Sequence, residues 1–146
     1  MTKPNKTGPR MNIRTLTLTL TLTLTAHSAP CEAFWGALHT VESGGGLGAI
    51  KGDHGAALGP LQIRRAYFQD SRVPGRYEDC ADLAYSRRVV SAYLQRYAKA
   101  AWDKGDRNSC DLLARVHNGG PNALRATGKK RANLDRYSAK VMSHLP

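Results

Sequence analysis

The chain has 146 residues, a length that suits a single domain. Its 22 basic and 11 acidic residues give a formal net charge of +11 at pH 7, which favours an anionic partner. No basic run interleaved with aromatic residues accompanies this charge, so the sequence offers no motif for nucleic-acid binding. The spacing of its three cysteines fits no zinc motif, and we expect neither a metal nor another cofactor.

Residues 1–29 have the layout of a secretory signal peptide. A basic stretch without acidic residues precedes an alternating Thr/Leu run from Thr15 to Thr25, and small residues follow it. The run is too short to cross a bilayer as a helix, although its alternation is also typical of a β-strand. We predict a cleaved signal over 1–29 and one domain over 30–146 with a net charge of +7. The mature protein would be secreted, or periplasmic in a bacterium.

The first predicted helix covers about residues 31–43, where apolar residues recur on one helical face. It places Glu42 at its end, because three glycines follow Ser43. The Gly- and Ala-rich segment 47–58 carries turn signals and predicts a loop or a poorly formed hairpin.

The remaining elements are predicted to be helical. One helix begins near Pro60, because proline suits the first turn of a helix, and a long one runs from about Glu78 to Asp103. A shorter helix follows Ser109 and ends before two glycines, and the last covers Asn133 to Leu145. The basic stretch 125–131 is predicted to be a solvated loop.

Two carboxyl groups are candidates for acid–base chemistry. A negative charge at the C-terminal end of a helix interacts unfavourably with the helix dipole, so the position of Glu42 requires an explanation. A partly desolvated Glu facing a cleft can protonate a glycosidic oxygen. Asp53 follows 11 positions later, where a returning loop would bring it within reach as the second carboxylate of a glycosidase. An ordinary surface Glu and a turn Asp that caps its own backbone are the structural alternatives.

Two further segments are candidates for ligand contacts. Gln62 lies in GPLQI and can hydrogen-bond a sugar or hold Glu42. His117, Asn118 and Gly119 lie in VHNGGP, where glycines allow a ligand to approach the backbone. The structural alternatives are a polar helix residue for Gln62 and a glycine helix cap for the second segment.

Over roughly residues 31–123, the chain resembles the invertebrate-type (i-type) lysozymes. The resemblance is carried by six segments in this order: VESGG, GD..G, GPLQI, YEDCA, VSAYLQRYA and C..LARVHNGGPNA. This resemblance implies a mostly helical, lysozyme-like α+β fold. It also implies hydrolysis of the β-1,4 bond between N-acetylmuramic acid and N-acetylglucosamine in peptidoglycan. Glu42 matches the general acid of the family, Asp53 matches its second carboxylate, and the segments of Gln62 and His117–Gly119 match parts of its saccharide cleft.

The chain departs from the family in its cysteines, since i-type lysozymes usually have many disulfides. Three cysteines are most simply one disulfide and one free thiol. The resemblance favours a Cys31–Cys110 bridge and leaves Cys80 unpaired. Fewer bridges would leave the 47–58 loop, and with it Asp53, less constrained.

Two other functions fit the same residues. A lytic transglycosylase would use Glu42 alone and leave a 1,6-anhydro product. It would not need Asp53, so a catalytic role for Asp53 would distinguish a hydrolase from it. A non-catalytic, basic protein that binds cell walls or anionic membranes would need neither carboxylate. In each case we expect a monomer that acts on the bacterial surface without stable insertion into a membrane.

Overall fold

The computed structural model describes residues 30 and 32–146. The predicted signal peptide and Cys31 lie outside the described residues. The α-helices are α1 (Glu32–Ser43), α2 (Arg65–Ser71), α3 (Leu83–Tyr97), α4 (Lys99–Lys104), α5 (Arg107–Gly119) and α6 (Gly128–Ser143). The short 3₁₀ helices are η1 (Asp53–Gly55), η2 (Tyr77–Ala81) and η3 (Ala123–Arg125).

One small antiparallel sheet lies between α1 and α2. Its strands are β1 (Lys51–Gly52), β2 (Ala57–Leu58) and β3 (Ile63–Arg64), in the order β1-β2-β3. Lys51 pairs with Leu58, and Leu58 pairs with Ile63. The predicted α+β class, mostly helical with a small hairpin after the first helix, is confirmed.

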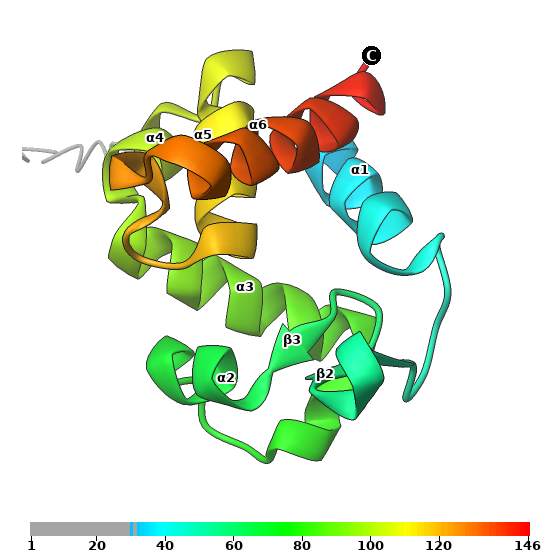
Figure 1. The fold of residues 1–146 in the computed structure, drawn as a ribbon. Coiled ribbons are helices and arrows are strands. Elements are labelled where there is room, and N and C mark those ends of the chain that lie inside the picture. Colours follow the sequence, from blue (N-terminus) through cyan, green and yellow to red (C-terminus); the bar gives the residue numbers. More distant parts are fainter. Residues whose placement is uncertain (1–29, 31) are drawn as a thin grey trace, which may run out of the picture.

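The helices and the sheet form two sides with α3 between them (Figure 1). Helix α6 packs on α5 and α1 on one side, while α2 contacts both α3 and β3 on the other. The core that joins them contains fully buried side chains from each part, including Phe34 and Leu38 of α1, Leu94 of α3 and Leu113 of α5. Burying each such side chain contributes about 1.5–3 kcal/mol. This core fixes the C-terminal end of α1 against α5 and α6.

The first helix ends where the sequence predicts. Its last residue is Ser43, and the chain then turns through Gly44 and Gly45, whose φ angles are +66° and +81°. These left-handed conformations strain any residue with a side chain. The glycines therefore leave Glu42 in the last turn of a helix whose other face is buried.

The prediction of a helix starting near Pro60 is wrong. Residues 59–62 form a turn, Ile63 and Arg64 pair with β2, and the helix begins only at Arg65. Gly59 has φ +81°, and a Cβ there would lie 1.9 Å from the carbonyl oxygen of Cys80. Close packing of the turn against η2 and strand pairing thus outweigh the helix preference of this segment.

The predicted helix from Glu78 to Asp103 is also interrupted. Asp82 has an extended backbone and accepts a hydrogen bond from the backbone N–H of Tyr85, so it caps the start of α3. A second break occurs at Ala98, where φ is −139°. The apolar pattern continues through both breaks, which is why periodicity alone does not show them.

The last two helices begin earlier than predicted. Helix α5 starts at Arg107, because Asp106 accepts the backbone N–H of Ser109 and caps it. Helix α6 starts at Gly128, so the end of the basic stretch 125–131 is helical rather than a loop. Helix α6 is held by packing on α5 and α1 rather than by its sequence pattern.

Candidate active site

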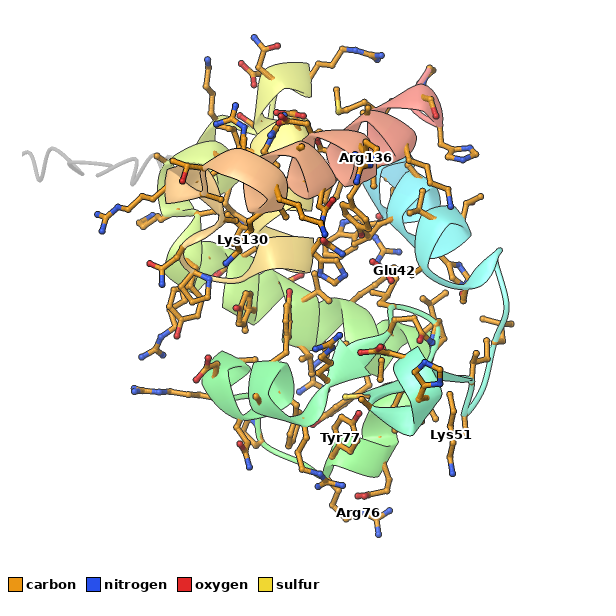
Figure 2. The ribbon with its side chains drawn as sticks, in the orientation of Figure 1. Glu42, Lys51, Arg76, Tyr77, Lys130 and Arg136 are labelled. Atoms are coloured by element: carbon orange, nitrogen blue, oxygen red, sulfur yellow. The ribbon has the colours of Figure 1, made fainter. Side chains whose placement is uncertain are left out.

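A cleft of about 720 Å³ lies between the end of α1, the small sheet, α2 and the end of α5. All six residues that the sequence predicts for catalysis or saccharide binding line it: Glu42, Asp53, Gln62, His117, Asn118 and Gly119. Figure 2 shows Glu42 between α6 and the sheet. Another hollow of similar size, near Leu47 and Arg87, contains none of these residues. The candidate catalytic and saccharide-binding residues therefore line the same cleft.

Glu42 is held at one of its two carboxyl oxygens. The hydroxyl of Tyr137, from α6, donates a hydrogen bond to Oε1 of Glu42. The Nε2 atom of His117, from α5, lies 3.2 Å from the same oxygen. The Glu42 side chain is only 14% exposed. Two helices thus supply polar partners to a carboxyl group that is mostly shielded from water.

A second layer of contacts fixes the imidazole of His117. The Tyr67 hydroxyl lies 3.0 Å from Nδ1 of His117, and the ring of Tyr67 stacks on Tyr93 with centroids 3.6 Å apart. Burial raises the pKa values of Tyr67 and Tyr137 well above the ordinary phenol value. Both phenols therefore stay protonated and can donate.

These contacts fit one tautomer of His117. If Tyr67 donates to Nδ1, the ring proton lies on Nε2, the nitrogen that is 3.2 Å from Oε1 of Glu42. Each of the two phenol hydroxyls in this chain of contacts then has a hydrogen-bond partner. No polar side-chain atom that is buried lacks a hydrogen-bond partner in the described part of the chain.

Asp53 lies on the sheet side of the cleft, at the start of η1. Its backbone has φ +50°, and its side chain is 46% exposed. Arg64 of β3 forms an ion pair with its carboxylate. This contact joins the turn after β1 to the far strand of the sheet, so the 47–58 segment is braced across the sheet.

Gln62 braces the same loop. Its side-chain amide donates to the carbonyl oxygen of Gly59 at 2.8 Å and lies 3.5 Å from that of Ile50. A Cβ on Gly52 would lie 1.7 Å from Oε1 of Gln62, so glycine is required for this approach. The amide nitrogen is thus engaged with the loop backbone, while the side chain still borders the cleft.

The turn after α5 forms the rim opposite the sheet. Asn118 is exposed there, and Gly120 has φ +78°. Gly119 has a packing role, because a Cβ at this position would lie 2.6 Å from a methyl carbon of Leu134 in α6. The glycines therefore allow α5 and α6 to meet beside the cleft.

Tyr67, Tyr137 and Arg64 complete the site, and sequence reasoning missed their roles. Tyr137 shares an inward helical face with Leu134 and Val141, which indicates burial but not a contact with Glu42. The sequence contains no local signal for this contact, because the two residues are 95 positions apart.

Neither Cys80 nor Cys110 lines the cleft. Cys80 is a buried thiol, and burial raises its pKa to about 11. Cys110 is also buried, and its predicted bridge to Cys31 stays a prediction, because Cys31 is not described.

The described residues contain no group of three potential metal ligands. No helix among them has the length and apolar character needed to span a membrane.

Comparison with known sequences identifies related proteins. The Destabilase family model matches residues 37–140. Lysozyme 1 of Crassostrea virginica is 40% identical over 89 residues, which are 60% of this chain and 44% of that protein. The lysozyme of Meretrix lusoria is 39% identical over 84 residues, which are 56% of this chain and 66% of that protein. The chain thus spans about half to two thirds of the length of these curated relatives.

Solved structures share the fold. The lysozyme of Tapes japonica has a TM-score of 0.60 and 28% identity, covering 77% of this chain and 91% of that one. The Meretrix lusoria lysozyme, in complex with Aeromonas hydrophila PliI, has a TM-score of 0.59 and 31% identity, covering 74% and 88%. The lysozyme-like fold is confirmed.

Proposed function

Because the chain belongs to the Destabilase family of invertebrate-type lysozymes, we propose that it is a glycosidase that acts on peptidoglycan. It hydrolyses the β-1,4 bond between N-acetylmuramic acid and N-acetylglucosamine. The observation that carries this proposal is the place of Glu42, a shielded carboxyl group that lines the cleft, accepts a hydrogen bond from Tyr137 and lies 3.2 Å from Nε2 of His117. The named activity of the relatives supports it.

Glu42 acts as the general acid. The scissile bond lies in the cleft with its glycosidic oxygen against Glu42, which transfers its proton to that oxygen as the C1–O bond breaks. The electron pair of the broken bond stays with the leaving sugar. The small exposure of Glu42 favours proton transfer to the sugar over exchange with bulk water.

Asp53 acts as the second carboxylate. It stabilises the positive charge that develops at C1, or bonds to C1, until a water molecule attacks C1 and gives a proton to Glu42, which restores the acid. Its place on the same cleft supports this role. Its ion pair with Arg64 means that the carboxylate must share its charge with a guanidinium during the reaction.

That same ion pair favours one other candidate function. An Asp53 engaged by Arg64 would be a loop brace, and Glu42 alone would then serve a lytic transglycosylase. In that reaction a hydroxyl of the muramic acid attacks C1, so the product ends in a 1,6-anhydro ring and no water is consumed.

The positive charge of the enzyme favours its association with an acidic surface. The net charge of +7 predicted for residues 30–146 suits a cell wall that contains acidic polymers, and it speeds association with them at low salt. We further propose that the protein is secreted, works as a monomer and needs no cofactor.

Mass spectrometry of the products tests the proposed function. Purified peptidoglycan is digested with the wild-type protein and with Glu42→Gln. Reducing muramic ends that are absent from the variant digest support the hydrolase. Anhydro-muramic ends identify a transglycosylase instead. Release of no fragments by the wild type would leave a non-catalytic protein that binds cell walls or membranes.

A further inference from the structure

We propose that Tyr137 and His117 are positioning residues that keep Oε1 of Glu42 as a hydrogen-bond acceptor, so that only Oε2 carries the transferable proton. This inference rests on the proposed function of Glu42 as general acid. It assigns a role to a residue of the last helix, near the C-terminal end of residues 37–140 that the family model matches.

Oε1 of Glu42 has two polar neighbours. Tyr137 donates to Oε1 through its hydroxyl, and Nε2 of His117 lies 3.2 Å from the same atom. A carboxyl oxygen has two lone pairs in the plane of the group. The Tyr137 hydroxyl uses one of them, and Nε2 of His117 is close enough to use the other when it carries the ring proton, so a proton on Oε1 would displace a donor. The proton of the neutral acid is therefore confined to Oε2.

The donors are themselves fixed. The His117 side chain is only 4% exposed, and the Tyr67 hydroxyl sets its tautomer from the other side of the ring. The Tyr67 ring stacks on Tyr93, which is 3% exposed. Tyr137 lies on α6, which packs on α1 and α5. Neither donor needs to reorganise when the reaction begins.

This arrangement acts on the transition state more than on the bound substrate. As the Oε2–H bond breaks, the proton moves to the glycosidic oxygen, and negative charge spreads over both carboxylate oxygens. Hydrogen bonds to an ionised acceptor are stronger than bonds to a neutral one. The Tyr137 and His117 donors thus strengthen as the charge develops, which raises kcat and leaves KM largely unchanged.

The variant Tyr137→Phe tests the inference, because it removes one hydroxyl and keeps the ring. With soluble peptidoglycan fragments as substrate, we expect kcat to fall about tenfold and KM to change less than about twofold. Tyr85→Phe is the matched control, since its hydroxyl bonds the carbonyl oxygen of Pro74 at 3.0 Å and lies outside the cleft. Its kinetic constants should equal those of the wild type.

Stability measurements add a readout that does not depend on turnover. The unfolding free energies of the wild type, Tyr137→Phe, Glu42→Leu and the double variant form a double-mutant cycle, because leucine removes the acceptor that glutamine would keep. A nonzero coupling between the two positions supports direct contact in solution. Additive effects would overturn the inference, whatever the activities are.

The outcomes separate the two proposals. If Glu42→Gln is inactive and Tyr137→Phe has lost kcat alone, both proposals are supported. If Glu42→Gln is inactive but Tyr137→Phe matches the wild type, the positioning role is wrong and the general acid stands. If KM instead rises by as large a factor as kcat falls, Tyr137 takes part in substrate binding and the positioning role is wrong. If Glu42→Gln retains full activity, the proposed function is wrong, and the positioning role fails with it.

Discussion

The hydroxyl of Tyr137, near the middle of the last helix, donates a hydrogen bond to Oε1 of Glu42 at the end of the first helix. This contact joins two elements that are 95 residues apart and brings α6 to the edge of the cleft. It makes the packing of α6 a condition for orienting the candidate acid. Changes in the helix interface should therefore affect the cleft as well as the fold.

Gly119→Ala tests that interface. A Cβ at Gly119 would lie 2.6 Å from a methyl carbon of Leu134 and 3.0 Å from Cβ of Ala123, so α5 and α6 must separate slightly. We expect the free energy of unfolding to fall by about 1–3 kcal/mol, as is usual for overpacking. Denaturant titration measures it.

Gly36→Ala is the matched control for this substitution. Gly36 lies within α1, and no heavy atom would lie within 4 Å of its new Cβ. Alanine is favoured over glycine inside a helix, so this variant should be more stable by about 0.5–1 kcal/mol. Equal behaviour of the two variants would contradict the described packing of α5 on α6.

His117→Phe should lower both stability and activity. The change removes one donor to Glu42 and the acceptor of the Tyr67 hydroxyl. A buried hydroxyl without a partner costs about 1–3 kcal/mol, which thermal or chemical unfolding will show.

Adding Tyr67→Phe to that variant checks the cause. With the hydroxyl gone, no polar atom is stranded, so the double variant should be less destabilised than the sum of the two single variants. Strict additivity would mean that Tyr67 and His117 do not interact in solution.

The sequence predicts the place of Glu42 but not its partners. The helical spacing of apolar residues and the glycines after Ser43 are local signals, and they fix the end of α1 correctly. The contact with Tyr137 forms only when α6 packs on α1, and no local pattern encodes it. Partners from distant elements are therefore the part of the site that sequence reasoning missed.

The errors in the fold have two origins. Asp82 and Ala98 interrupt a segment whose apolar pattern is continuous, because an aspartate cap and a nonhelical φ are set by single residues. The turn at Gly59 fails to start a helix because it packs against the backbone of Cys80, so a tertiary contact outweighs local preference there.

Cys80 should be inert to alkylating reagents in the folded protein. Its thiol is fully buried, and burial raises its pKa to about 11, so almost no thiolate is present at pH 8. Treatment with iodoacetamide before and after denaturation, followed by peptide mapping, measures this. Rapid labelling of native Cys80 would contradict its described burial.

The raised thiol pKa also predicts a loss of stability at high pH. The fold favours the neutral thiol, so this contribution is complete below about pH 9 and decreases as the pH rises towards 11. The difference in unfolding free energy between the wild type and Cys80→Ala should shrink by about 2 kcal/mol over that range. A constant difference would place the thiol in a more polar environment.

Asp53→Asn tests the second carboxylate. If Asp53 stabilises charge at C1, we expect kcat to fall about a hundredfold or more. Glu78→Gln is the control, because Glu78 also pairs with an arginine, Arg65, but does not line the cleft. Full hydrolytic activity in Asp53→Asn would show that its ion pair with Arg64 only braces the loop.

The central claim is that Glu42 is the general acid, and an activated leaving group tests it most directly. A dinitrophenyl glycoside of the peptidoglycan disaccharide departs without protonation, so it does not require an acid. We predict that Glu42→Gln loses at least about a hundredfold in kcat/KM on peptidoglycan but keeps close to the wild-type kcat/KM on this glycoside, because kcat/KM reports the step that breaks the glycosidic bond and not the later attack of water. Equal losses on both substrates would contradict the role of Glu42 as proton donor and would assign it to binding or to structure.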